Sequence, residues 1–310
     1  MKKTGYVSLF ALSLAACSGG SGATKPTDVT AEPAGDIVAE CNAAAEVAKK
    51  EAELYRAVDP STLDAARAAY SGFQRTIERW KADDAPCARE GASVTDRMAT
   101  LQEVEKVLAA AEAEGTQKLV RHLEPNVDMA RDFLDVVFAS GRAPSDAVIE
   151  AAHSVDRRYR ERLMTKFGES EKYAQLDDAL ATTCVFGEAA IDPQAEKITQ
   201  NFKSIFAGDR TEVHALCRLP LPASKYGGDA QGKLFVVLDD DTDLSNGTVY
   251  EGDLGTPEQW KETQYFKARF DIPQGPPSRG DAGVYYVTMK VQRPQMGDET
   301  PVSNRFYWHR

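Results

Sequence analysis

The hydrophobic residues of this chain change their spacing once, near residue 209. Before that point they recur every three or four residues, as in the run Leu63, Ala66, Tyr70, Phe73, Ile77 and Trp80. This spacing places them on one face of a helix. After that point they alternate with polar residues, for example over 265–272 and 285–292, which is typical of half-buried strands. The change of period predicts two differently built parts.

The first part, residues 36–208, is predicted to be an antiparallel helical bundle. Pro125 marks a break or kink, and glycines such as Gly115 punctuate the helical pattern. The helical runs are expected over 37–55, 63–80, 98–108, 119–138, 145–167, 169–184 and 193–206.

The second part, residues 213–310, is predicted to be a separate small antiparallel β-sandwich or barrel. Turn signals such as Asn246-Gly247 and Pro276-Pro277 separate its alternating runs. Strands are expected near 213–219, 234–238, 265–272, 285–291 and 302–308. The expected fold class is therefore α+β.

The N-terminus carries a sorting signal. Lys2 and Lys3 precede an apolar stretch over 6–16 that is shorter than the roughly 20 residues of a membrane-spanning helix, so residues 1–16 are predicted to be a signal peptide. The following Leu14-Ala15-Ala16-Cys17 resembles the lipobox of bacterial lipoproteins. This resemblance implies cleavage before Cys17 and attachment of lipid to its sulfur. The alternative is an ordinary cleaved signal peptide with a chance cysteine.

Residues 17–35 are predicted to be a flexible tether behind the lipidated cysteine, because they begin with a Ser/Gly run and show no apolar periodicity. Several acyl chains anchor a protein stably. The resemblance therefore implies a place in the cell envelope, attached to a membrane. Ser18 follows the cysteine where retained inner-membrane lipoproteins typically carry Asp, which by this resemblance favours the outer membrane in an organism with two membranes.

The net charge argues against nucleic acid as a partner. The chain has 37 Lys and Arg against 48 Asp and Glu, a net charge of -11, which is the wrong sign for contact with phosphates. The acidity is uneven: residues 17–212 carry 24 basic and 35 acidic residues, whereas residues 213–310 carry 11 and 13. If the protein recognises a charged partner, the nearly neutral second part is therefore the expected place.

Four cysteines remain after Cys17, an even number in an exported chain, where disulfides form and persist. Three pairings are possible. A hairpin of the first two helices brings Cys87 back toward Cys41, and Cys184 with Cys217 then forms a second local pair. A metal site is the poorer alternative, because the chain has no Cys-x-x-Cys and its four histidines are scattered.

The sequence contains two further candidate sites. Asp239, Asp241 and Asp243 resemble the start of a calcium loop, but Leu244 and Tyr250 stand where Gly and Glu belong, and a solvated hairpin loop is preferred. The second is a β surface that mixes aromatic and basic residues and is suited to binding. It would consist of Tyr265, Lys267, Arg269, Tyr286, Lys290, Arg305 and Tyr307.

No catalytic motif is present: the chain lacks His-Glu-x-x-His, Gly-x-Ser-x-Gly, Ser-x-x-Lys and the phosphate-binding glycine loops. We therefore expect no catalytic residues, no cofactor, and a scaffold or binding function in the envelope; if a metal binds, it is Ca²⁺ in the aspartate loop. The expected partners are the membrane, through the lipid, and another envelope protein or a glycan. The alternative is an envelope hydrolase or carbohydrate-acting enzyme with carboxylates between its two parts, since paired carboxylates leave no local motif.

Overall fold

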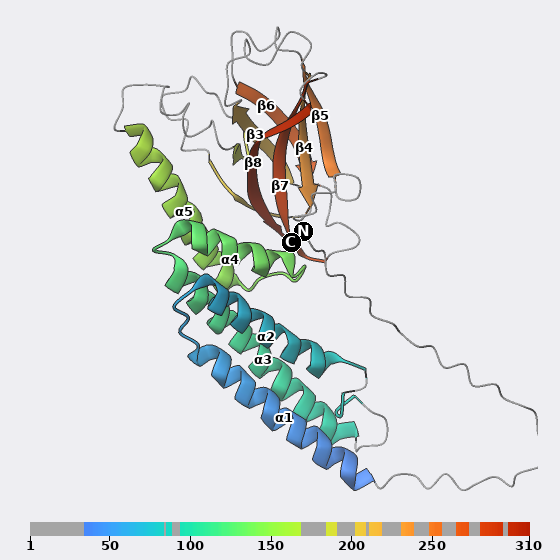
Figure 1. Ribbon diagram of the computed structural model, residues 1–310. Helices are drawn as coiled ribbons and strands as arrows, with labels where there is room; N and C mark the ends of the chain where they lie inside the picture. Colours follow the sequence, from blue (N-terminus) through green and yellow to red (C-terminus); the bar gives the residue numbers. More distant parts are fainter. Residues whose placement is uncertain are drawn as a thin grey trace, which may run out of the picture.

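The computed structural model describes residues 34–83, 85–88, 94–168, 184–190, 202–208, 211–218, 231–238, 248–255, 265–272, 280–293 and 297–310. Within these ranges the chain forms five helices and two sheets, so the fold is mixed α+β as predicted (Figure 1). The helices are α1 (Ala34–Ala57), α2 (Leu63–Lys81), α3 (Val94–Leu123), α4 (Val127–Ala139) and α5 (Asp146–Gly168). The strands are β1 (Val185–Gly187), β2 (Ile205–Ala207), β3 (Thr211–Arg218), β4 (Gln231–Leu238), β5 (Thr248–Gly255), β6 (Tyr265–Ile272), β7 (Ala282–Arg293) and β8 (Gly297–His309).

The long helices pack through one buried face each. On α1 the buried residues follow a four-three spacing: Cys41, Ala45, Ala48, Ala52 and Tyr55. The Tyr55 ring stacks on Phe73 of α2 with centroids 4.3 Å apart, and its hydroxyl lies 2.9 Å from the Thr116 hydroxyl of α3. Small residues along α1 let it approach its neighbours closely, and the tyrosine closes the end of this core.

Helix α3 passes through Gly115 without interruption, so the predicted break there is wrong. The glycine is required for packing, because a Cβ atom at this position would lie 2.4 Å from the Tyr55 ring. The break at Pro125 is confirmed: α3 ends at Leu123, and α4 begins after Asn126, whose side chain accepts a hydrogen bond from Met129 N at 3.3 Å.

The strands form two sheets that share one hydrophobic core. The first has the order β1-β3-β6 and is antiparallel; the second has the order β2-β8-β7-β4-β5 and is antiparallel except for the parallel pair of β2 with β8. Both sheets contribute to the core, which includes Phe186, Phe206, Val213, Val236, Tyr285 and Phe306. The alternation along β7 therefore predicted correctly that Tyr285 and Val287 turn toward this core.

Strands β1 and β2 arise within the range predicted to be helical. The predicted helix over 193–206 is wrong at its end, where residues 205–207 pair with Tyr307, Trp308 and His309 of β8. Three apolar residues in a row are too few to distinguish a strand from a helix. Residues 202–204 are not helical either. Residues 193–201, and residues 169–183 of the preceding predicted helix, lie outside the described residues.

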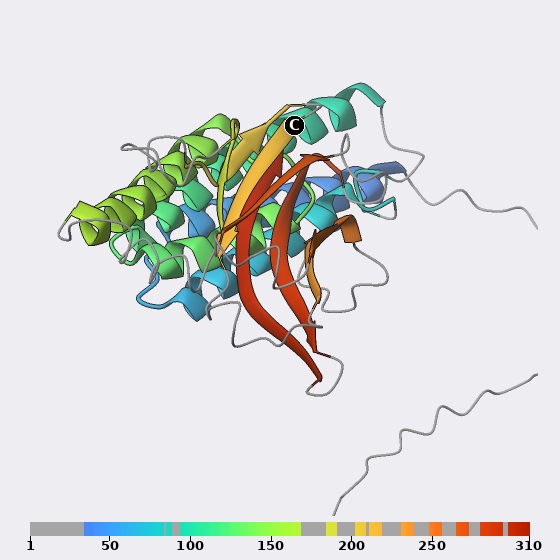
Figure 2. The same ribbon diagram turned by 90° about the horizontal axis from the view of Figure 1, so that it is seen from above.

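The helices and strands meet across a buried interface. Helix α4 packs on β7 and β8, and α5 contacts β2; Figure 2 shows the strands lying over the helices. The hydrophobic cluster of the helices includes Ile205, Ala282, Val284 and Tyr307 from the strands. No helix in the described part of the chain is long and apolar enough to cross a membrane.

Candidate functional site

A pocket of about 360 Å³ opens between α5 and the residues next to β1 and β2. Helix α5 contributes three polar side chains one turn apart, because residues at i, i+3 and i+7 share a helix face. The segments after β1 and before β2 close the other side. The lining residues are His153, Asp156, Arg160, Glu188, Ala189, Phe202 and Lys203. This is the place between the helices and the strands where the enzyme alternative requires its carboxylates.

Asp156 is the buried acid of the pocket, with 5% of its surface exposed. The Ser204 hydroxyl donates a hydrogen bond to Oδ1, and Arg160 Nε lies 3.6 Å from Oδ2. Both oxygens thus have a partner, as a buried carboxylate requires. Ser204 lies in the segment before β2, so this hydrogen bond also joins α5 to the strands.

Glu188 is the second acid, and it forms an ion pair with Lys203 across the pocket. Lys203 is itself fixed at two points: its N–H donates to the Phe186 carbonyl at 2.8 Å, and its ammonium lies 5.5 Å from the centroid of the Phe206 ring. Each carboxylate of the pocket therefore already faces a cation of the same chain.

His153 lies at the exposed edge of the pocket. Partial burial lowers the pKa of its imidazole below the usual value; Asp156 pulls the pKa upward, and the neighbouring cations lower it further. At neutral pH the ring is therefore uncharged, able to donate one hydrogen bond and accept another. Within the described residues, no three His, Cys, Asp or Glu side chains gather where they could hold a metal ion.

Both carboxylates of the pocket are paired with cations. Arg160 lies beside the Asp156 carboxylate, and Lys203 lies beside the Glu188 carboxylate. The pocket is therefore better suited to binding a small polar ligand than to supplying a general acid and a general base for a reaction.

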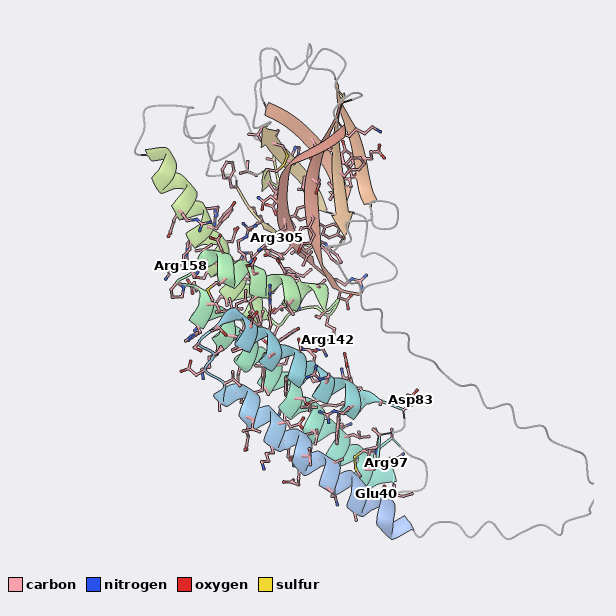
Figure 3. All side chains as sticks on the ribbon, viewed as in Figure 1. Glu40, Asp83, Arg97, Arg142, Arg158 and Arg305 are labelled. Carbon is pink, nitrogen blue, oxygen red and sulfur yellow. A yellow bond between two sulfur atoms is a disulfide. The ribbon has the colours of Figure 1, made fainter. Side chains whose placement is uncertain are left out.

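A second polar group, next to the pocket, joins α4 to β8, and we call it the latch: Arg131, Asp132, Asp135, Asn304, Arg305 and Tyr307. Arg305 is where the strands meet α4 (Figure 3); it pairs with Asp132, and its Nε lies 2.7 Å from Asp135 Oδ1. The Tyr307 hydroxyl lies 2.9 Å from both Asp135 Oδ1 and the Arg131 carbonyl oxygen. The latch is a partly buried, connected network of the kind that fixes one arrangement of two elements; within it Arg131 Nε has no hydrogen-bond partner among the described residues.

Arg131 is buried, with 6% of its surface exposed. Its Nη2 donates to Asn304 Oδ1 at 3.1 Å and to the Arg305 carbonyl at 3.0 Å, and its guanidinium lies 4.2 Å from the Tyr159 ring centroid of α5. One arginine of α4 therefore contacts both the last strand and the pocket helix.

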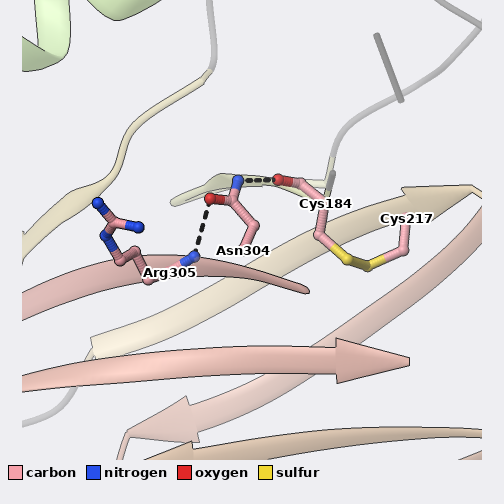
Figure 4. Close-up of a disulfide and its surroundings, with 4 residues drawn as sticks. All are labelled: Cys184, Cys217, Asn304 and Arg305. Carbon is pink, nitrogen blue, oxygen red and sulfur yellow. Dashed lines mark hydrogen bonds between the residues drawn. A yellow bond between two sulfur atoms is a disulfide. The ribbon is translucent and has the colours of Figure 1, made fainter. Parts of the chain in front are cut away.

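The disulfide pairs expected from the hairpin argument are both present. Cys41 pairs with Cys87 and Cys184 with Cys217. The second disulfide is connected to the latch, because Asn304 Nδ2 donates to the Cys184 carbonyl while Asn304 Oδ1 accepts from Arg305 N at 2.8 Å (Figure 4). One asparagine thus ties the strand pair held by the disulfide to the helix–strand interface.

The predicted aromatic and basic surface is not a single face. Tyr265, Lys267 and Arg269 belong to β6 of the three-stranded sheet, whereas Tyr286, Lys290, Arg305 and Tyr307 belong to β7 and β8 of the other sheet. Arg269 pairs with Glu212 of β3. Tyr286 and Arg305 do face each other in register.

The expectation that Arg305 and Tyr307 face solvent is corrected by the position of α4. Alternation along β8 does place them opposite the shared sheet core, but α4 covers that face, and Tyr307 is 1% exposed. Tyr286 also packs partly against the helical cluster. These three residues serve the helix–strand interface. Cys17 and the aspartates Asp239, Asp241 and Asp243 lie outside the described residues.

The sequence analysis does not predict the latch, although the sequence contains one signal for it. Arg131 stands at a helical spacing with Val127, Leu134 and Phe138, all four of which are buried. A cation on the apolar face of a helix requires a buried partner. The pocket residues gave no such signal, because Glu188 and Lys203 come together only through the short strands β1 and β2.

The described residues thus define a mixed α+β protein with a polar pocket and a latch where the helices meet the strands. No family model matches the chain, and no curated protein matches it.

Proposed function

We propose that this protein is a lipid-anchored lipoprotein of the bacterial cell envelope, without catalytic activity, that holds a β binding module away from a membrane. The lipobox-like Leu14-Ala15-Ala16-Cys17 and the tether over 17–35 support the anchor. In this account residues 1–16 are a removed signal peptide, and the outer membrane is the favoured location. The helices act as an antiparallel bundle, and the two sheets as a small sandwich.

The observation that carries the proposal is the position of the start of α1. The tether joins α1 at Ala34, and this end of the helix lies at the far end of the helical part from the strands (Figure 1). Helix α3 has 30 residues, which corresponds to about 45 Å at 1.5 Å per residue. A chain anchored at one end of such a rod carries its strands at the other.

The latch also supports a spacer function. A spacer must hold its two ends in a fixed arrangement, and the contacts of the latch join the helices to the last strand through Arg131, Asp135, Arg305 and Tyr307. A flexible junction would need no such network. The partner proposed for the β module is another envelope protein or a glycan, and the membrane is contacted through the lipid alone.

The enzyme alternative has one observation in its favour: Asp156 and Glu188 do meet in a pocket between the helices and the strands. Their ion pairs with Arg160 and Lys203 favour ligand binding there instead. If the two acids act in hydrolysis, the wild-type protein adds hydrolytic activity to envelope extracts, and replacing both acids by amides abolishes that activity. If the pocket only binds a ligand, the wild-type protein adds no hydrolytic activity.

The anchor is tested by replacing Cys17 with Ser. We expect the wild-type chain to incorporate labelled fatty acid and to sediment with membranes, and the variant to do neither. A Cys17→Ser chain that still takes up label and stays with the membranes would overturn the proposed anchor.

The binding module is tested by photo-crosslinking in intact envelopes. A crosslinkable residue at Glu251, exposed on β5, is compared with one at Glu105, exposed on α3. We expect a reproducible crosslinked partner from Glu251 and none from Glu105. Crosslinks from the helix alone, or from neither position, count against a β binding module.

A further inference from the structure

Arg160 of α5 lines the pocket between the helices and the strands, and its hydrogen-bonding capacity is unused. Its Nε is buried without a hydrogen-bond partner. The 3.6 Å between this atom and Asp156 Oδ2 is an ion-pair distance that is too long for a hydrogen bond. The terminal nitrogens of the guanidinium do not donate to any residue that the structure describes either. A buried polar atom without a partner requires an explanation, and a bound ligand beside it is one.

Other arginines with a buried, unpaired Nε use their terminal nitrogens. Arg67 Nη2 donates to a backbone carbonyl at 3.1 Å, and Arg131 Nη2 donates within the latch. Arg162, two positions beyond Arg160 on the same helix, donates to both oxygens of Asp128 at 3.0 and 2.9 Å. The Arg160 guanidinium therefore remains available, in a pocket, for the two parallel hydrogen bonds that a planar carboxylate accepts from arginine.

Glu188, on the other side of the pocket, has an unused acceptor. Its Oε1 accepts a hydrogen bond from the Lys203 ammonium, whereas Oε2 has no partner among the described residues. A carboxylate offers about four lone-pair sites on its two oxygens, and 64% of this side chain is exposed. Glu188 can therefore accept from a further donor while its contact with Lys203 persists.

The charged side chains that line the pocket balance one another. Asp156 and Glu188 are two acids, Arg160 and Lys203 are two bases, and His153 is uncharged at neutral pH because partial burial lowers the pKa of its imidazole. A simple anion would meet two carboxylates, and a simple cation would meet two basic groups. A ligand that carries one charge of each sign can face a group of opposite sign at both ends. The volume of about 360 Å³ is sufficient for a small molecule.

We propose that this pocket binds a small zwitterion with the chemistry of a free amino acid. Arg160 donates two hydrogen bonds to the ligand carboxylate, and Glu188 Oε2 accepts one from the ligand ammonium group. Because Arg160 belongs to α5 and Glu188 follows β1, the ligand bridges the helices and the strands. This site goes beyond the proposed anchor and β module and does not depend on them. Binding without lipid attachment at Cys17, or lipid attachment without binding, is a distinguishable result.

The first test measures binding to the full chain in detergent by calorimetric titration. The probes are the common amino acids, each tested alone, followed by the amide and the N-acetyl derivative of the one that binds most tightly. The amide lacks the carboxylate and the N-acetyl derivative lacks the ammonium group, so each should bind about tenfold or more weakly. No binding by any amino acid, equally tight binding of the two derivatives, or tighter binding of inorganic phosphate or glucose would overturn the proposal.

The second test locates the ligand in the pocket. Arg160→Met removes the carboxylate donors, and Glu188→Gln removes the charge that faces the ammonium group; each should weaken amino-acid binding about tenfold or more. Arg157→Met is the matched control, because Arg157 is an exposed arginine of α5 that does not line the pocket, and it should leave the affinity unchanged. If denaturant unfolding shows that Arg160→Met destabilises the fold, the exposed Glu188 decides the test. Undiminished binding by Glu188→Gln, or equal weakening by the control, would overturn the proposal.

Discussion

The hydroxyl of Tyr307 on β8 lies 2.9 Å from the carboxylate of Asp135 on α4. These two residues are 172 positions apart in the chain, and each belongs to a differently built part of the molecule. Burial raises the pKa of the Asp135 carboxyl, although Arg305 and the tyrosine hydroxyl pull it down, and burial also raises the pKa of Tyr307. The contact thus joins a fully buried tyrosine to a carboxyl that is largely withdrawn from water.

Replacing Tyr307 by Phe tests the latch energetically. The Tyr307 hydroxyl has one proton, which it donates to the Asp135 carboxylate or to the Arg131 carbonyl. Losing this donor in a largely buried place costs about 1–3 kcal/mol. Tyr285→Phe is the matched control, since the Tyr285 hydroxyl is buried and has no partner among the described residues. Its removal should leave stability unchanged or improve it. Denaturant unfolding of both variants measures the difference, and equal losses of stability would contradict the role given to Tyr307.

Gly115→Ala tests the close packing of α1 on α3. The added methyl group would lie 2.4 Å from the Tyr55 ring, and such overpacking costs about 1–3 kcal/mol. Gly72→Ala makes the same chemical change at an open helical position and should stabilise by about 0.5–1 kcal/mol. Thermal unfolding should therefore move in opposite directions for the two variants. A stabilising Gly115→Ala would contradict the packing described.

The pKa of His153 provides a test of the pocket. The folded-state pKa lies below the usual value, so the unfolded chain binds the proton more tightly. The free energy of unfolding therefore falls as the pH drops through about 6.5 and His153 becomes protonated in the unfolded chain. This loss of stability ends once the pH is below the folded-state pKa. By NMR titration, Asp156→Asn should lower the pKa further and Lys203→Met should raise it. A pKa that does not respond to either change would contradict the pocket geometry.

Each disulfide is expected to contribute separately to stability. The loops closed by Cys41–Cys87 and Cys184–Cys217 span 46 and 33 residues, which corresponds to about 4 kcal/mol each if chain entropy dominates. Replacing either pair by serines should lower the free energy of unfolding by that order. The second pair should also weaken the latch, because the Cys184 carbonyl accepts from Asn304. An unchanged midpoint in both variants would contradict this account.

Much of the fold follows from local patterns in the sequence. The change of period near residue 209 separates five helices from most of the strands, and the hairpin of the first two helices predicts the Cys41–Cys87 pair. These features depend on neighbouring residues or on one reversal of direction. They are therefore accessible without knowledge of how distant elements pack.

The remainder depends on contacts between elements far apart in the chain. Residues 205–207 form a strand because β8 is beside them, and three residues carry no period of their own. Alternation placed Arg305 and Tyr307 correctly on one face of β8 but did not predict that α4 covers it. The pocket and the latch were therefore beyond the reach of sequence patterns, except for the buried position of Arg131.

The central claim is that the helical rod and the strands move as one body. Spin labels at Glu40, near the start of α1, and at Glu251 on β5 report on it directly in the full-length protein reconstituted in membranes, by pulsed electron resonance. We predict a single narrow distance distribution that broadens when Tyr307→Phe and Arg305→Met are introduced. A broad or multiple distribution in the wild-type protein would contradict a rigid spacer.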